Sequence, residues 1–100
     1  LDAICQVKGV DCLFIGRMDL TVALGETDAN SPKVIETVSK IVQVANKHEL
    51  ATGMFIANLD ELEHWLKLHV SLFLLGSDHS FMLSGARQLQ ATFEQAKQAQ

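Results

Sequence analysis

Three short apolar runs, separated by segments with helical periodicity, constrain the fold of this chain more than any other feature. The runs are CLFIG from Cys12, ATGMFI from Ala51 and VSLFLLG from Val70. Runs that are apolar throughout and alternate with helices predict strands buried on both faces of a parallel sheet, joined by right-handed crossovers. The sequence therefore predicts an α/β fold with the order βαβαβα. Three parallel strands leave two unpaired sheet edges, so we expect further strands from additional chain or from a partner.

The other segments carry helix signals. DAICQV is expected to end a helix, and Ser31 followed by Pro32 predicts the N-cap and first turn of the helix that begins SPKVIETVSK. Asn58 and Glu61 have the spacing of a capping box. Trp65 falls on the apolar stripe of the helix that follows, which predicts a role in core packing. The last segment, ending in EQAKQAQ, is predicted to be a helix with a solvated end.

Length and composition limit the classes of function. A chain of 100 residues forms one domain at most, and 48% hydrophobic residues indicate a globular one. The net charge of −4, with no basic cluster, disfavours nucleic acid or an anionic membrane as a partner. No apolar run approaches the ~20 residues of a membrane span, and the first residues lack the features of a secretory signal. We therefore expect a cytoplasmic protein, with Cys5 and Cys12 as reduced, buried thiols.

Candidate ligand-binding residues follow each apolar run, where the carboxyl ends of parallel strands meet at one edge of the sheet. They are Gly16 to Asp19, Ile56 to Asn58, and Gly76 to Ser80. Gly76, Ser77 and Asp78 precede a helix, where free backbone N–H groups favour a carboxylate or phosphate. The alternative there is a plain turn with Asp78 or Ser80 as the helix cap. Asp19 is likewise either a ligand-holding acid or the cap of the short segment LTVAL.

The four histidines differ in position. His48 falls at the end of a helix, where a cation complements the helix dipole. His64 and His69 do not share a helix face, so surface or packing roles are expected for them. His79 follows GSD at the predicted edge of the sheet and is the one candidate for a site role.

The stretch VDCLFIGRMDLTVALG, from Val10, resembles the strand-and-loop signature of the metal-dependent pyruvate aldolases. That family includes 4-hydroxy-2-oxoheptanedioate aldolase, 2-dehydro-3-deoxyglucarate aldolase and the citrate lyase beta subunit. Downstream, SPKV, GMFIANLDELEHWLKLHVSLFLLGSD and SGARQLQATF keep the family's order and spacing. The resemblance implies that residues 1–100 are a single partial domain, the C-terminal segment of a (β/α)8 barrel, with strands six to eight and their helices.

The resemblance also implies a function. Asp19 would be one of two carboxylate ligands of a divalent cation, magnesium or manganese. The backbone N–H groups of Met18 and Asp19 would face the carboxylate of pyruvate or another 2-keto acid. The metal would act as a Lewis acid when the carbon–carbon bond of a 4-hydroxy-2-keto acid breaks to give pyruvate and an aldehyde. Phe55 or Ile56 would line the apolar side of the pocket, with Gly76 and Ser77 as possible anion contacts, and a homo-oligomer is expected.

The segment departs from the family's Gly-Pro-small-Asp pattern at two positions. Arg17 stands in place of the proline, which restores a backbone N–H, and Met18 is bulkier than the usual small residue. Arg17 is expected either to favour an anionic substrate or to point into solvent. The family's second metal-binding Glu, its substrate-binding Arg and its acid/base His precede the part of the pattern that begins at Leu1. We therefore expect no catalytic residue within the segment and no turnover by the segment alone.

Two other classes of function stay open at this point. One is a non-catalytic α/β module that binds a small anion at Gly76 to Ser80. The other is a structural fragment that associates with itself through its exposed sheet edges.

Overall fold

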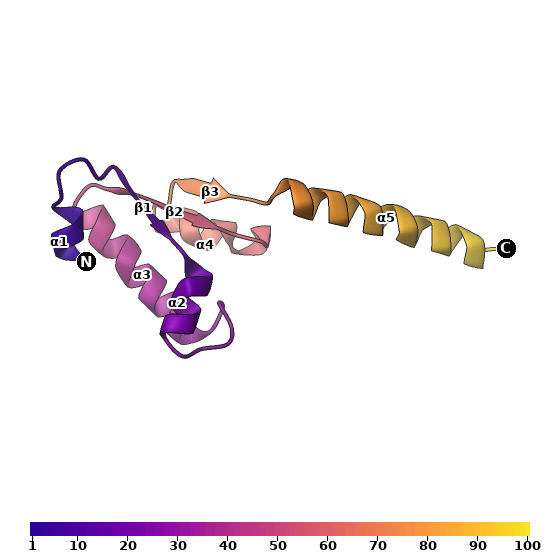
Figure 1. The fold of residues 1–100 in the computed structure, drawn as a ribbon, viewed down its shortest axis with the longest axis horizontal. Helices are drawn as coiled ribbons and strands as arrows, with labels where there is room; N and C mark the ends of the chain where they lie inside the picture. Colours follow the sequence, from indigo (N-terminus) through magenta and orange to yellow (C-terminus); the bar gives the residue numbers. More distant parts are fainter.

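The computed structural model describes residues 1–100 and contains three strands with helices between and after them (Figure 1). The elements in chain order are α1 (Asp2–Cys5), β1 (Cys12–Ile15), α2 (Arg17–Ala23), α3 (Pro32–Lys47), β2 (Ala51–Phe55), the 3-10 turn η1 (Leu59–Glu61), α4 (Leu62–Lys67), β3 (Leu72–Leu74) and α5 (Asp78–Gln98). Each strand lies in an apolar run that predicted it. The order βαβαβα is confirmed.

The three strands form one parallel sheet with β2 in the centre. Phe14 of β1 pairs with Gly53 of β2, which pairs in turn with Leu72 of β3. The outer edges of β1 and β3 have no strand partner, as the sequence predicted. Both edges therefore expose backbone hydrogen-bonding groups to which further strands could pair.

Helix α3 covers one face of this sheet and supplies much of the core. Its N-cap is Ser31, whose Oγ accepts a hydrogen bond from the backbone N–H of Val34 at 3.4 Å, as expected from the Ser-Pro pair. Trp65 of α4 is fully buried, which confirms its predicted packing role. Both cysteines are free thiols, with Cys5 buried and Cys12 half-buried. The core cluster consists of Ile15, Val34, Val38, Val42, Met54, Ile56, Trp65 and Val70.

The other face of the sheet is apolar but uncovered. Phe14, Phe55, Leu72 and Leu74 are each between 46% and 51% exposed, and we call these four residues the open face. The prediction of burial on both faces is therefore met on the helix-covered face only. The reason is that no element of these 100 residues packs over the open face.

Helix α5 leads away from the sheet, which gives the molecule its length of 64 Å (Figure 1). It contains no buried residue, so its predicted solvated end is confirmed, but its apolar side chains are exposed as well. None of the helices is both long and apolar enough to cross a membrane.

Candidate active site

Asp19 lies in the first turn of α2, directly beyond the end of β1. The strand ends at the buried Ile15, and Gly16 is the N-cap of α2 with an extended backbone conformation. The helix begins at Arg17 and has no side-chain cap. The alternative in which Asp19 caps the LTVAL segment is therefore wrong, because the helix starts two residues before it. Its carboxylate is left available for another role.

Gly16 provides the space that the Asp19 carboxylate occupies. A Cβ atom at Gly16 would lie 2.7 Å from Asp19 Oδ2, closer than such atoms approach in proteins. The backbone of Gly16, with φ −83° and ψ 91°, is one that other residues also adopt. The crowding at Gly16 therefore comes from the neighbouring carboxylate and not from the backbone conformation.

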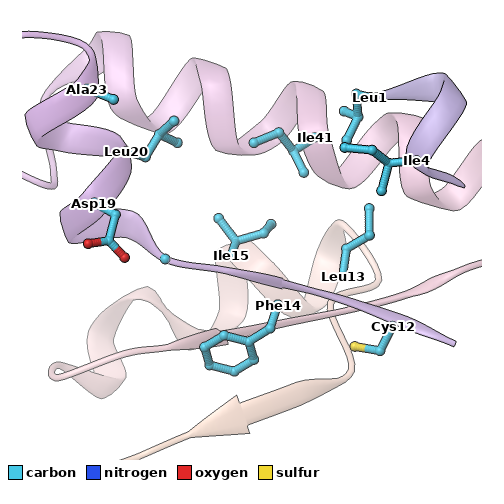
Figure 2. Close-up of a pocket in the computed structure, with 11 residues that line it drawn as sticks. Leu1, Ile4, Cys12, Leu13, Phe14, Ile15, Asp19, Leu20, Ala23 and Ile41 are labelled. Atoms are coloured by element: carbon cyan, nitrogen blue, oxygen red, sulfur yellow. The ribbon is translucent and has the colours of Figure 1, made fainter. Parts of the chain in front are cut away.

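Asp19 borders two pockets. The first, which we call the apolar pocket, has a volume of 490 Å³, and Asp19 lies at one end of it beside Leu20 (Figure 2). Leu13 and Ile15 of β1 and Ile41 of α3 line its length, whereas Phe14 points to the opposite side of the strand (Figure 2). Asp19 therefore presents the one acidic group of an otherwise apolar wall.

The second pocket lies at the carboxyl ends of β1 and β2, and we call it the rim pocket. It has a volume of 260 Å³ and is lined by Phe14, Ile15, Gly16, Arg17, Met18, Asp19, Ala29, Asn30, Phe55 and Ala57. Met18 is 66% exposed, so its longer side chain does not fill the core. Of the two residues proposed for the apolar side, Phe55 lines this pocket, while Ile56 is only 1% exposed and belongs to the core cluster. The alternating directions of side chains near the strand end separate the two.

Arg17 is buried, which corrects the expectation that it points into solvent. Only 9% of it is exposed, so it does not point into solvent. Its Nη1 donates to Glu61 Oε1 in an ion pair, and its Nη2 donates to Asn30 Oδ1 at 2.6 Å and to the Ala29 carbonyl oxygen at 3.2 Å. Its positive charge is thus matched within the protein. Arg17 also lines the rim pocket, and its role towards an anionic substrate stays a prediction.

Glu61 takes part in this ion pair and does not complete a capping box. Asn58 Oδ1 accepts from the backbone N–H of Asp60 at 2.9 Å, so Asn58 is the N-cap of η1 as predicted. Glu61 Oε1 accepts instead from Arg17 and from Trp65 Nε1, the latter at 3.3 Å. Sequence reasoning missed this pair, although Arg17 and Glu61 are opposite charges that each follow a neighbouring strand.

The third group of candidate residues, after β3, forms a helix cap. Ser77 Oγ accepts from the N–H of Ser80 at 3.1 Å, and Ser80 Oγ accepts from the N–H of Ser77 at 2.9 Å. Asp78 Oδ1 accepts from the N–H of His79 at 2.7 Å. The cap is therefore Ser77, with Ser80 as its reciprocal partner, in place of Asp78 or Ser80 alone. Of the N–H groups expected to bind an anion, that of Ser77 is already used in this cap.

Residues 76–80 line neither of the two pockets beside Asp19. A Cβ atom at Gly76 would lie 2.7 Å from the ring of Phe81, which is exposed. The structure therefore brings together the residues that follow β1 and β2, but not those that follow β3. His79 is exposed in the first turn of α5, away from both pockets.

The other histidines have the surface and packing positions that the sequence predicted. The His48 ring contacts Asp2 Oδ1 through Nε2 at 2.8 Å, and this hydrogen bond lowers the pKa of the Asp2 carboxyl below its ordinary value of 3.8. His64 packs edge-on against Trp65, with 4.6 Å between ring centroids. His69 lies just after α4, with a positive φ of 68°.

The donor groups of the chain fit a single metal ligand and not a complete metal site. Asp19 offers a hard carboxylate oxygen of the kind that magnesium and manganese bind. No group of three His, Cys, Asp or Glu side chains lies close enough to hold a metal ion. Any cation bound by Asp19 would need its remaining ligands from substrate, water or residues outside these 100.

Comparisons with known proteins point to one family. Residues 1–84 match the family model described as HpcH/HpaI aldolase/citrate lyase. The 5-keto-4-deoxy-D-glucarate aldolase of Shigella boydii serotype 18 is 30% identical over 95 residues, which cover 94% of this chain and 37% of that protein. The hydroxypyruvate/pyruvate aldolase of Paraburkholderia phytofirmans is 30% identical over 89 residues, which cover 88% of this chain and 34% of that protein.

Solved structures give the same result for the fold. A HpcH/HpaI aldolase/citrate lyase family protein from Burkholderia cenocepacia J2315 superposes with a TM-score of 0.85 and 26% identity, over 93% of this chain and 37% of that one. The citrate synthase SbnG superposes with a TM-score of 0.78 and 28% identity, over 97% of this chain and 39% of that one.

The chain spans little more than a third of the length of these relatives. Its open sheet is thus a C-terminal portion, about three βα units, of a (β/α)8 barrel. The family model covers most of the chain, including both strand ends that form the rim pocket. By sequence and by fold, this chain belongs to the HpcH/HpaI aldolase/citrate lyase family.

Proposed function

We propose that the complete protein to which this chain belongs is a cytoplasmic, divalent-metal-dependent aldolase that cleaves 4-hydroxy-2-keto acids to pyruvate and an aldehyde. The observation that carries the proposal is the position of Asp19 in a chain of this family. Its carboxylate lies at the carboxyl end of a parallel strand, between two pockets and with no cap to make. Barrel enzymes hold their reacting groups at this end of the strands.

In this proposal Asp19 is one of two carboxylate ligands of magnesium or manganese. Such a cation, when bound, supplies Lewis-acid stabilisation to the negative charge that develops on the substrate's keto oxygen. The backbone N–H groups of Met18 and Asp19 orient the carboxylate of pyruvate or a related 2-keto acid. Phe55 gives the rim pocket an apolar wall. The groups that transfer protons and the second carboxylate lie outside these 100 residues.

The test is the substitution Asp19→Asn in the complete protein, assayed for pyruvate release from a 4-hydroxy-2-keto acid with manganese present. We expect metal-dependent turnover to be abolished while the fold is kept, since Asp19 is not a core residue. Asp11→Asn is the matched control, because Asp11 is an exposed acid that lines neither pocket. Equal activity in both variants would remove Asp19 from the site.

The alternative of a non-catalytic anion-binding module makes a different prediction. Among its candidate N–H donors, that of Ser77 already bonds Ser80 Oγ, so an anion at this N–H would have to displace the cap. Calorimetric titration with oxalate separates the two functions, because only the aldolase requires magnesium for tight binding. Magnesium-independent binding that is lost in Ser77→Ala would favour the module.

We also propose that the complete protein is a homo-oligomer. The support is the exposed apolar side chains of α5, since contiguous exposed apolar surface marks interaction sites. Those residues are Phe81, Met82, Leu89 and Phe93. Sedimentation equilibrium of the complete protein tests the proposal, and a monomer at micromolar concentration would contradict it.

A further inference from the structure

We propose that Arg17 is a positioning residue that fixes the start of α2, and with it the Asp19 carboxylate. The inference rests on the proposed metal role of Asp19 and adds to it a residue that touches neither substrate nor metal. Arg17 is the first residue of α2, and Asp19 is the third, so the two share the same helical turn.

The Arg17 side chain ties this turn to two other segments. One nitrogen of the guanidinium bonds Glu61, at the end of η1 beyond β2. The other bonds Asn30 Oδ1 at 2.6 Å and the Ala29 carbonyl oxygen at 3.2 Å, in the loop that leads into α3. That loop is itself held by a turn in which Asp28 Oδ1 accepts from the Asn30 N–H at 2.9 Å. A planar fork with donors in fixed directions is needed to reach both segments at once.

The burial of Arg17 makes these bonds hard to exchange for water. The guanidinium carbon lies 5.5 Å from the centre of the Trp65 ring, and Trp65 Nε1 donates to the same Glu61 oxygen as Arg17. Trp65 is fully buried, so its ring is held in place by the core where it packs against the guanidinium. A buried charge must stay close to its partner, because separating them leaves both uncompensated. The position of Arg17 is therefore fixed by Glu61 and Trp65 together.

Other contacts of α2 transmit this position to Asp19. Thr21 Oγ1 donates to the Arg17 carbonyl oxygen at 2.6 Å, and Thr21 is buried. The N–H of Leu20 bonds the Gly16 carbonyl oxygen at 3.0 Å, which closes the turn that contains Asp19. A helix of seven residues has few bonds of its own, so an outside anchor at its first residue sets its direction. Movement of this anchor would move Asp19 relative to the rim pocket.

The hydrogen bonds of Arg17 also connect the residues that follow β1 to those that follow β2. Residues from both groups line the rim pocket, so this connection holds the pocket together. Arg17, Ala29 and Asn30 all line that pocket, next to Asp19. Loss of the guanidinium contacts would therefore loosen the part of the pocket formed by these residues, and the metal ligand with it.

The experiment compares variants of the complete protein at a temperature where circular dichroism shows each to be folded. Arg17→Lys keeps a positive charge to pair with Glu61, but its single ammonium group cannot bond Glu61 and Asn30 at the same time as the two guanidinium nitrogens do. The readout is the dissociation constant of Mn²⁺, measured by electron paramagnetic resonance of the free ion, beside kcat and KM. We expect Arg17→Lys to raise this constant about tenfold, the lower end of the effect of groups that orient metal ligands. We expect kcat to fall with it.

Two further variants separate positioning from stability. Val42→Ala truncates a fully buried core residue of α3 that lines neither pocket, so it lowers stability and leaves Mn²⁺ affinity unchanged. Asn30→Ala removes one acceptor of the guanidinium and leaves the ion pair, so it should weaken Mn²⁺ binding by about threefold, less than Arg17→Lys. It serves as the test if Arg17→Lys does not fold.

The outcomes distinguish this inference from the proposed function. Mn²⁺ affinity that falls in Asp19→Asn but is the same in Arg17→Lys, Asn30→Ala and Val42→Ala would overturn the positioning role and leave the metal role of Asp19 in place. Mn²⁺ affinity that is unaffected by Asp19→Asn would overturn both. Weaker binding in Arg17→Lys and Asn30→Ala, with wild-type binding in Val42→Ala, supports the inference.

Discussion

Gly16→Ala tests the proposed site by a single methyl group. The new Cβ would lie 2.7 Å from Asp19 Oδ2, so the carboxylate has to rotate away from the position it now holds. Moving a side chain off its preferred torsions costs about 0.5–1.5 kcal/mol. We therefore expect Mn²⁺ binding to the complete protein to weaken by about twofold to tenfold, since 1.4 kcal/mol is a factor of about 10 in affinity.

The same substitution should change stability little. The φ and ψ of Gly16 are allowed for alanine, so no backbone strain is added. The free energy of unfolding should fall by about 0.5–1 kcal/mol, because alanine is a poorer N-cap than glycine. Gly85→Ala is the matched control: a Cβ there meets nothing within 4 Å, and alanine favours the interior of α5. Titration with Mn²⁺ and urea unfolding measure the two effects. Wild-type Mn²⁺ affinity in Gly16→Ala, together with weaker binding in Asp19→Asn, would show that the metal is held by a different orientation of Asp19.

Three further predictions concern stability and titration in the complete protein. Glu61→Ala should lower the free energy of unfolding, measured by urea titration, by about 3 kcal/mol. This is the lower end for a broken buried ion pair, because Glu61 is 23% exposed. The control Glu63→Ala breaks the exposed pair with Lys67 and should cost less than about 1 kcal/mol. Gly53→Ala should destabilise by about 1–3 kcal/mol, since its Cβ would lie 3.0 Å from both Phe14 and Leu72; wild-type stability would show that these side chains move apart freely. The pKa of Asp2, measured by NMR, should be below 3.8 and should return towards 3.8 in His48→Ala. The small stabilisation from this contact is present above the pKa of Asp2 in the unfolded chain and is lost as pH falls through its lowered pKa in the folded protein. An unchanged pKa of Asp2 in His48→Ala would exclude the contact in solution.

The elements of this fold that depend on local sequence were predictable. Ser31 and Pro32 mark the start of α3, and the strands lie within the three apolar runs, because caps and periodicity are properties of adjacent residues. The position of Asp19 beyond β1 followed from the same local pattern. Its role as a metal ligand stays a prediction, supported by the family resemblance.

The interactions that depend on packing were not predictable. Arg17 and Glu61 are 44 residues apart, and nothing near either residue indicates that a buried aromatic floor brings them together. The spacing of Asn58 and Glu61 suggested a capping box, in which Glu61 would accept a hydrogen bond from the Asn58 N–H. Glu61 instead pairs with the buried guanidinium of Arg17. Residues 76–80 were expected beside Asp19 because all three strands point the same way. Sequence gives the order of strand ends and does not give the distance between them.

The central place of β2 has a consequence for the order in which the sheet assembles. Both ladders need β2, but Gly53 lies roughly twice as far along the chain from Phe14 as from Leu72, and each doubling of a loop adds about 0.6 kcal/mol to the entropy cost of closing it. On loop-closure entropy alone, the β2–β3 pair is therefore the cheaper one to form. Because Gly16 to Asp19 follow β1, the ladder that is costlier to close is the one that carries the candidate metal ligand to the pocket.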